Sequence, residues 1–363
     1  MRLLNTETCQ FQNFFDGNAP FYAILSHRWD DVEATYQEFE SATTKAGPGF
    51  KKVLDCCAYA RAQGLKWVWI DTCCIDKTSS AELSEAINSM FRWYNNAVEC
   101  YVHLKDVGES TWKEELGTSE WWERGWTLQE LLAPGKVVFL DKAWKVIGGR
   151  EELAGEIARI TGIPERFLDG REELGGASVA MRFSWAARRQ TSRVEDRAYS
   201  LMGLFGVNMP MLYGEGRNAF LRLQLEILKL SDDESIFAWR RDTDPGASGH
   251  GMLARRLEYF RESGDIVRRP KRTDRPPYSM THKGLKLQLP RSTVEGTTRI
   301  VLPLDCVDGD NVGPLAIVLY KPHAGFWARL DSHELRQAPS EHLWTRRDCV
   351  YPNRATIYVR EEH

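Results

Sequence analysis

The feature that most constrains the fold of this 363-residue chain is a regular alternation within its first 150 residues. Short apolar runs alternate with stretches whose apolar residues recur every three to four positions. The runs are typical of buried strands and the stretches of amphipathic helices. Strands that alternate with helices predict a parallel sheet with helices on both faces, an α/β fold of the flavodoxin type. The runs predicted as strands are Phe21–Leu25, Trp67–Asp71, Val98–Leu104 and Val137–Leu140.

Polar side chains follow the first two of these predicted strands. The carboxyl ends of parallel strands meet at one edge of a sheet, and ligands of open α/β sheets bind beyond that edge. We therefore expect the residues at these strand ends to form one binding rim. They are Ser26, His27, Arg28, Trp29, Asp71 and Asp76.

The stretch Trp121–Pro134 predicts one short helix that follows the third strand. Trp122, Trp126 and Glu130 are four residues apart, so they would share a helix face. A carboxylate one turn beyond an indole can hold a planar cationic group. Taken alone, the stretch is better explained by core tryptophans and a solvated Glu130. However, the stretch follows the third predicted strand and should therefore begin beside the rim. This position favours a functional role, in which Trp126 and Glu130 belong to the site.

Several rim residues keep two interpretations. His27 suits a general base, yet a loop histidine bound to a neighbouring backbone group is favoured. Asp71 suits a ribose hydroxyl or a cap on its own loop. Arg28 has a guanidinium that could meet phosphate oxygens. Cys73 and Cys74 have no base implied nearby, so buried thiols are favoured over nucleophiles.

Beyond residue 150 the pattern changes to helices and then to short strands. Three domains are expected: an α/β core at 1–150, a helical extension packed on it at 151–240, and a β-rich domain at 252–363. The predicted helices are Glu151–Thr161, Ser178–Arg189, Val194–Phe205 and Glu215–Leu230. The predicted strands are Leu285–Leu289, Arg299–Leu304, Leu315–Tyr320 and Thr356–Arg360.

Composition excludes some classes of function. The chain has 48 basic and 51 acidic residues, which gives no signal for a polyanion partner. A solvated loop is favoured over nucleic-acid binding for the basic segment Arg268–Arg275. No apolar run reaches the roughly 18 residues of a membrane span, and no CxxC pair suggests a zinc or redox site. We therefore expect a cytoplasmic protein with no metal, nucleic-acid partner or membrane anchor.

The first ~240 residues resemble the HET (heterokaryon incompatibility) domain of filamentous fungi. Several long motifs occur in the order that this family shows. One departure is Arg28, where many members have threonine; it adds a cation at the rim. The matching segments are Tyr22–Trp29, Trp69–Asp76, Arg124–Pro134, Arg193–Leu201 and Tyr213–Gly216.

Residues 20–145 also resemble, more distantly, a TIR domain. Trp126–Leu131 is similar to the TIR pattern Trp-Cys-x-x-Glu-Leu, whose glutamate cleaves nicotinamide from NAD in the enzymatic members. The resemblance implies that Glu130 is catalytic and that NAD(P)+ is a substrate rather than a prosthetic group.

Two functions follow from these resemblances. The first is a nicotinamide-releasing NAD(P)+ glycohydrolase in cell-death, incompatibility or immune-like signalling, activated by self-association or by a partner protein. The alternative is a non-catalytic module that oligomerises and recruits partners.

Overall fold

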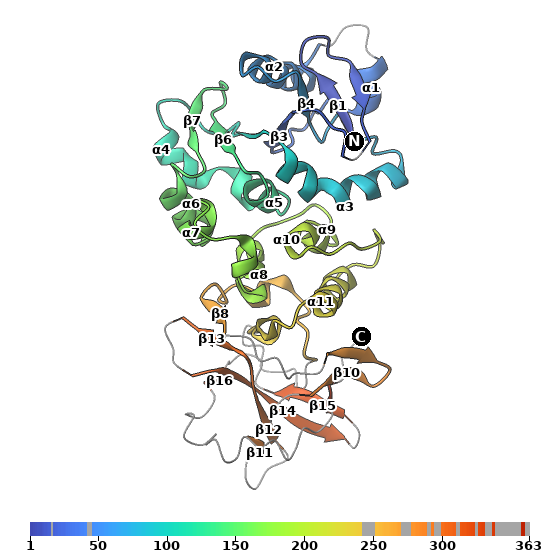
Figure 1. The fold of residues 1–363 in the computed structure, drawn as a ribbon, viewed down its shortest axis with the longest axis vertical. Helices are drawn as coiled ribbons and strands as arrows, with labels where there is room; N and C mark the ends of the chain where they lie inside the picture. Colours follow the sequence, from blue (N-terminus) through green and yellow to red (C-terminus); the bar gives the residue numbers. More distant parts are fainter. Residues whose placement is uncertain are drawn as a thin grey trace. The chain divides into compact units, whose positions relative to one another are not determined.

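The structure is a computed structural model that describes most of the chain (Figure 1). The described part forms two compact units, Met1–Leu174 with Arg189–Leu212, and Gly175–Arg188 with Tyr213–His363. The described residues are 1–15, 17–41, 46–241, 251–269, 277–288, 292–293, 299–309, 313–323, 326–330, 336–337 and 357–359.

The first unit is built on a seven-stranded mixed sheet in the order β2-β1-β4-β3-β5-β6-β7. Its four central strands are parallel, as expected. Their order, second-first-third-fourth along the chain, is that of flavodoxin-type sheets. The parallel strands are β3 (Ala23–His27), β4 (Trp67–Trp69), β5 (Glu99–His103) and β6 (Val137–Leu140).

Antiparallel strands flank this parallel core on both sides, which the sequence did not predict. β1 (Arg2–Asn5) pairs antiparallel with β4 and with β2 (Phe11–Asn13). β7 (Val146–Gly149) pairs antiparallel with β6. These strands are three or four residues long, too short for an alternating pattern to identify them. The sheet is therefore mixed rather than wholly parallel.

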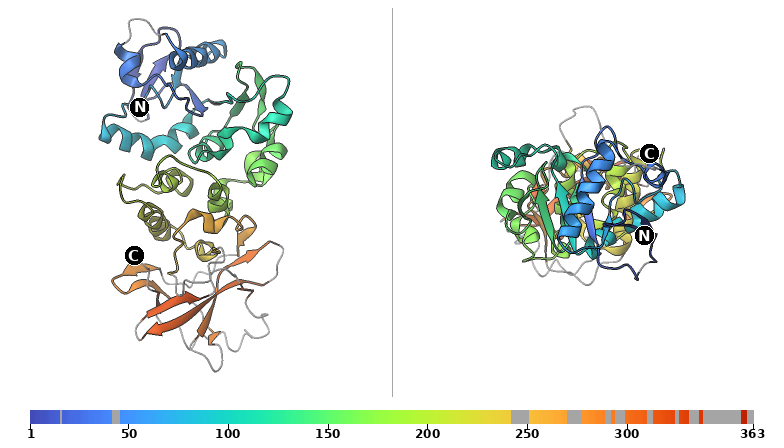
Figure 2. Two further views of the ribbon diagram at one scale, coloured as in Figure 1. Left: turned by 180° about the vertical axis from the view of Figure 1, so that it is seen from behind. Right: turned by 90° about the horizontal axis from the view of Figure 1, so that it is seen from above.

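Helices cover opposite faces of the sheet because neighbouring residues of a strand point to opposite sides. On β5, the ring of Tyr101 meets Tyr59 of α2 (Pro48–Ala62) with centroids 4.9 Å apart. The adjacent Cys100 thiol lies 3.7 Å from the carbonyl oxygen of Glu130 in α5 (Thr127–Leu132). Thus α2 and α5 lie on opposite faces, and Figure 2 shows the same layers from behind and from above.

Helix α3 (Ser80–Asn96) is one of the amphipathic helices that alternate with the strands. Its N-cap Ser79 accepts a hydrogen bond from the Glu82 amide at 3.3 Å, as a capping box requires. The Glu82 carboxylate accepts from the Asp76 amide instead of completing the box at Ser79. From its other end, Tyr94 donates to the Leu25 carbonyl at 3.0 Å, which fixes α3 on β3.

The tryptophan stretch is not one helix, and that prediction was wrong. A 3-10 turn (Glu120–Glu123) ends at Arg124, whose ψ of 138° is extended. The Gly125 amide donates to the Gln190 carbonyl at 2.7 Å, so it cannot bond within a helix. A Cβ on Gly125 would lie 2.5 Å from Thr191 Cγ2, so the close approach requires glycine. Trp122, Trp126 and Glu130 therefore do not stack along a single helix.

Residues 151–240 form short helices that belong to both units. The prediction of one helix at 194–205 was wrong, because two separate helices form there: α9 (Asp196–Tyr199) and α10 (Met202–Phe205). In α10, a Cβ on Gly203 would lie 2.1 Å from Phe91 Cβ, so glycine allows α10 to pack against α3. The other helices are α6 (Ala154–Thr161), α7 (Glu165–Leu168), α8 (Val179–Ala187) and α11 (Asn218–Leu230).

The second unit combines α8 and α11 with small, largely antiparallel sheets. Its main sheet has the order β11-β12-β14-β15-β17-β10-β9, in which β9 is Ser279–Thr281, β11 is Ser292–Thr293 and β15 is Phe326–Leu330. The predicted strands are all present, as β10 (Gly284–Leu287), β12 (Arg299–Pro303), β14 (Leu315–His323) and β17 (Ile357–Val359). Residues 242–250 and most of the basic segment Arg268–Arg275 lie outside the described residues. The division into three domains, at 1–150, 151–240 and 252–363, stays a prediction.

Candidate functional site

The Glu130 carboxylate is buried at the carboxyl edge of the parallel strands, with 8% of the residue exposed. Ser26, near the end of β3, donates its hydroxyl proton to Oε2 of Glu130. The Ser26 oxygen in turn accepts from the Trp121 indole N–H at 2.9 Å. Burial raises the pKa of Glu130 to about 7, although Ser26, Arg124 and Arg189 favour the charged form. The carboxylate thus titrates near neutral pH in a fixed hydrogen-bonded position.

Two buried arginines fix the short helix that carries Glu130. Arg150 donates to the carbonyls of Leu131 at 2.8 Å and Pro134 at 2.9 Å, which are free at the end of a helix. At the other end, Arg189 donates to the Arg124 carbonyl at 3.0 Å and to the Thr127 hydroxyl at 2.8 Å. A six-residue helix is unstable alone, so these bonds hold α5 in place. No local pattern in the sequence marks Arg150 or Arg189 as part of the site.

His27 ends β3 on the face opposite to Ser26, since adjacent strand residues alternate. Its side chain is buried, and neither ring nitrogen has a hydrogen-bond partner in the described structure. Nε2 lies 3.8 Å from Glu33 and 3.9 Å from Asp71, beyond hydrogen-bond length. Burial first, and then the charge of Lys52, lowers the pKa of His27 well below its usual value. The ring is therefore neutral and has capacity for a further hydrogen bond.

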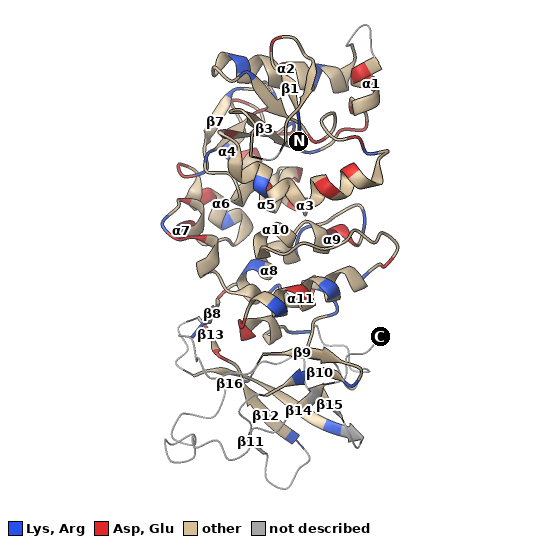
Figure 3. Cartoon of the chain, turned by 45° about the vertical axis from the view of Figure 1, so that its right-hand side comes forward, with Lys and Arg blue, Asp and Glu red and all other residues tan. Residues whose placement is uncertain are grey.

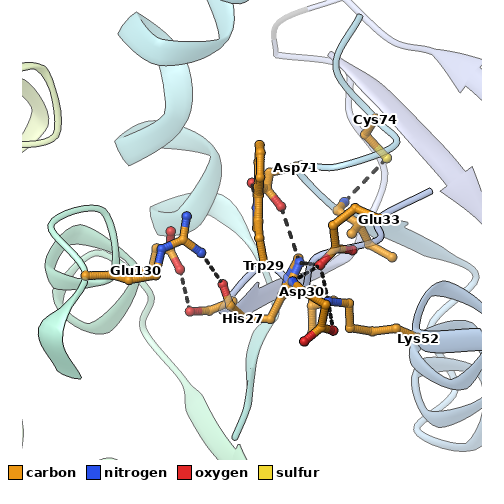
Figure 4. Close-up of polar contacts among 12 residues, drawn as sticks. His27, Trp29, Asp30, Glu33, Lys52, Asp71, Cys74 and Glu130 are labelled. Carbon is orange, nitrogen blue, oxygen red and sulfur yellow. Dashed lines mark hydrogen bonds and ion pairs between the residues drawn. The ribbon is translucent and has the colours of Figure 1, made fainter. Parts of the chain in front are cut away.

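Trp29, just beyond β3, is held by Asp71 across the rim. Its indole N–H donates to Oδ2 of Asp71 at 2.8 Å (Figure 4). Two cations lie over the ring: Lys77 Nζ at 3.5 Å from its centroid and the Arg124 guanidinium carbon at 5.7 Å. Arg124 also donates to the His27 carbonyl at 2.9 Å. The structure thus brings Trp29 and Asp71 together, as predicted, and adds Lys77 and Arg124.

An ion-pair cluster supports the other side of the rim. The buried Lys52 pairs with Asp30 at 2.8 Å and with Glu33 (Figure 4). Lys105 also pairs with Asp30, at 2.8 Å. Arg28 does not stand free at the rim, because its Nε lies 2.8 Å from a Glu120 carboxylate oxygen. A phosphate bound to Arg28, as predicted, would have to compete with Glu120 for the guanidinium.

Other predicted residues have structural partners. Asp76 accepts from the Thr78 amide at 2.9 Å and from the Gln37 side chain, which orders the turn before α3. Trp126 is half-buried and directly precedes α5. Instead, Trp121 is the indole linked to Glu130 through Ser26. Cys73 is buried, and burial raises its pKa well above the usual range, so the thiol is not activated.

The arrangement offers a buried carboxylate, a neutral imidazole and two cations along one sheet edge. Among the described residues, no group of three or more His, Cys, Asp or Glu side chains is placed to hold a metal ion. Also within that part, no helix is long and apolar enough to span a membrane. Lys/Arg and Asp/Glu are interspersed over the described chain in Figure 3, with no large region of one sign in that view.

The first unit is thus a flavodoxin-type α/β domain with a buried carboxylate at the carboxyl edge of its sheet. Residues 22–111 match the family model described as heterokaryon incompatibility protein (HET). The match includes the Ser26–Asp76 side of the rim and ends before α5 and Glu130.

The chain is also similar to the vegetative incompatibility protein HET-E-1 of Podospora anserina. The two are 44% identical over 239 residues, which are 63% of this chain and 17% of that protein. The matched region therefore spans less than a fifth of the relative. No solved structure gives a significant match.

Proposed function

We propose that the chain is an NAD(P)+ glycohydrolase that acts in heterokaryon incompatibility, with Glu130 as the catalytic residue. The HET domain and the similarity to a vegetative incompatibility protein support the biological setting. The single observation that supports catalysis is the buried Glu130 carboxylate, fixed by Ser26 at the carboxyl edge of the sheet. This is the edge at which flavodoxin-type sheets bind their ligands.

In this reaction, water replaces nicotinamide on C1 of the ribose, giving ADP-ribose (or its phosphate), nicotinamide and a proton. Nicotinamide leaves as a neutral molecule, so no acid has to protonate it. The ribose passes through an oxocarbenium-like cation, and a nearby carboxylate stabilises that charge. The effect is larger in a site with a low dielectric constant, such as the surroundings of Glu130. A cationic substrate would also favour the ionised form of a carboxyl whose pKa is about 7.

The test compares nicotinamide release from NAD+ by the full chain and by Glu130→Gln. The variant keeps the shape and an oxygen that can accept from Ser26, but loses the charge. Turnover should fall roughly a hundredfold or more, because one preorganised transition-state contact is lost. Glu85→Gln is the matched control, since Glu85 is an exposed carboxylate on α3. Equal turnover by wild type and Glu130→Gln would remove the catalytic role.

The alternative is a non-catalytic module that oligomerises and recruits partners. The side chains of Phe15 and Phe21 favour it, because they are 87% and 84% exposed, and exposed apolar surface can mark a site of protein interaction. In this case the wild-type chain would release no nicotinamide, even when concentrated or assembled. Substitution of both phenylalanines by serine would abolish self-association in ultracentrifugation and leave the melting temperature unchanged.

A further inference from the structure

Most cations around the rim are already neutralised by carboxylates. Arg28 pairs with Glu120, while Lys52 and Lys105 both pair with Asp30. Lys77 and Arg124 differ: within the described structure, neither forms an ion pair, and each lies over the Trp29 ring. The rim thus has two cations whose charge no direct contact neutralises.

The position of Lys77 is electrostatically unfavourable without a ligand. The side chain is partly buried, and burial lowers its pKa despite the nearby Asp71. Arg124 lowers the same pKa further, so the two cations are close enough to repel each other. Asp71 forms no ion pair with either cation in the described structure, and its Oδ2 accepts from the Trp29 indole. An anion between Lys77 and Arg124 would compensate both charges.

The neighbouring His27 independently indicates a missing polar partner. The residue is 3% exposed and both ring nitrogens lack a hydrogen bond in the described structure. A buried polar group without a partner destabilises the fold unless a ligand or water supplies one. Arg124, which binds the His27 carbonyl, also lowers the pKa of Glu130, so it connects this region with the carboxylate.

We propose that Lys77 and Arg124 bind a phosphate group of the nucleotide beside Trp29, within reach of the neutral His27. This inference rests on the proposed function, which identifies the ligand as NAD(P)+. It adds that the phosphate groups of this ligand bind to Lys77 and Arg124. An ammonium and a guanidinium both donate charge-assisted hydrogen bonds to phosphate oxygens. The site then selects phosphorylated ligands, such as dinucleotides, over nucleosides that have the same glycosidic bond.

The test measures binding of three probes to the full chain by calorimetry: NAD+, nicotinamide riboside and inorganic pyrophosphate. Lys77→Met keeps the length of the side chain and removes its charge. It should weaken NAD+ and pyrophosphate binding about tenfold or more, and change nicotinamide riboside binding less than about twofold. Lys113→Met is the matched control, because Lys113 also lies over an indole, Trp112 at 5.7 Å, but outside the rim. It should leave all three affinities unchanged.

A second variant separates charge from folding. Lys77→Arg keeps the positive charge and should retain NAD+ binding within a few-fold, whereas Lys77→Met should not. Both should melt at or above the wild-type temperature, because removing or delocalising a poorly compensated charge does not weaken the fold. Unchanged NAD+ affinity in Lys77→Met would overturn the inference, as would equal losses for NAD+ and nicotinamide riboside.

The outcomes also distinguish this inference from the proposed function. If wild type releases no nicotinamide but binds pyrophosphate through Lys77, the anion site stands and the enzymatic function fails. If nicotinamide is released with an unchanged KM for NAD+ in Lys77→Met, the function stands and the anion site is wrong. Failure of wild type to bind either NAD+ or pyrophosphate overturns the anion site.

Discussion

The raised pKa of Glu130 predicts how the stability of the fold depends on pH. Burial raises this pKa from 4.5 to about 7 in the folded state. At low pH the carboxyl is protonated in the folded and unfolded states alike. Between pH 4.5 and 7 the folded state binds the proton more tightly, so the free energy of unfolding falls as pH rises. The shift corresponds to roughly 3 kcal/mol, fully lost above pH 7, at about 1.4 kcal/mol for each pKa unit.

Glu130→Gln should therefore be stabilising at pH 8 and nearly neutral at pH 5. Glutamine has no charge to desolvate and can still accept the hydrogen bond from Ser26. The gain at pH 8 should approach 3 kcal/mol, since that is the cost of the buried charge. A domain of this size gains about 2–4 °C in melting temperature for each kcal/mol.

Melting curves of wild type and Glu130→Gln at pH 5 and pH 8 measure this difference directly. Glu85→Gln, at the exposed site on α3, should show the same small difference at both values. A Glu130→Gln variant that melts below wild type at pH 8 would refute the reasoning, because Glu130 would then be a stabilising charge. A stability gain together with lost turnover is the pattern expected of a catalytic carboxylate.

Three further predictions concern the support of this carboxylate. Trp121→Phe keeps the packing but removes the donor to Ser26, so the free energy of unfolding should change by about 1 kcal/mol or less while nicotinamide release falls several-fold. Arg150→Met leaves the last carbonyls of α5 without partners and should lower the free energy of unfolding by about 2–4 kcal/mol in denaturant titrations. A fragment ending at residue 150 lacks the bonds from Arg189 to the start of α5, so it should not melt cooperatively in calorimetry.

The parallel core could be predicted because its signals are local. The apolar runs that became β3, β4, β5 and β6 are long enough to distinguish strands from their surroundings. The edge strands could not be predicted, since β2 has three residues and only one of them is partly buried. Such a strand forms because β1 supplies hydrogen-bond partners, and this information lies elsewhere in the chain.

The break at Gly125 explains why the site was predicted only in part. Helical spacing correctly placed Glu130 on a short helix beside the strand ends, but it paired that carboxylate with Trp122 and Trp126. The pairing failed because the backbone of Gly125 bonds to Gln190, 65 residues later, which no local pattern records. With the helix interrupted, Trp121 rather than Trp126 reaches the Ser26–Glu130 pair.

The alternation of side chains along β3 changes the predicted arrangement of Ser26 and His27. Ser26 and His27 are adjacent in β3, so they point to opposite faces and cannot both contact Glu130. Ser26 fixes the carboxylate, while His27 lies with Lys52 and Glu33 on the face of α2. Trp29 follows the last residue of β3, so the alternation of strand side chains between the two faces does not apply to it. The same holds for Lys77 and Arg124, which lie over its ring. A ligand that contacts both faces would therefore cross the edge of the sheet at Trp29, where the proposed phosphate site of Lys77 and Arg124 lies.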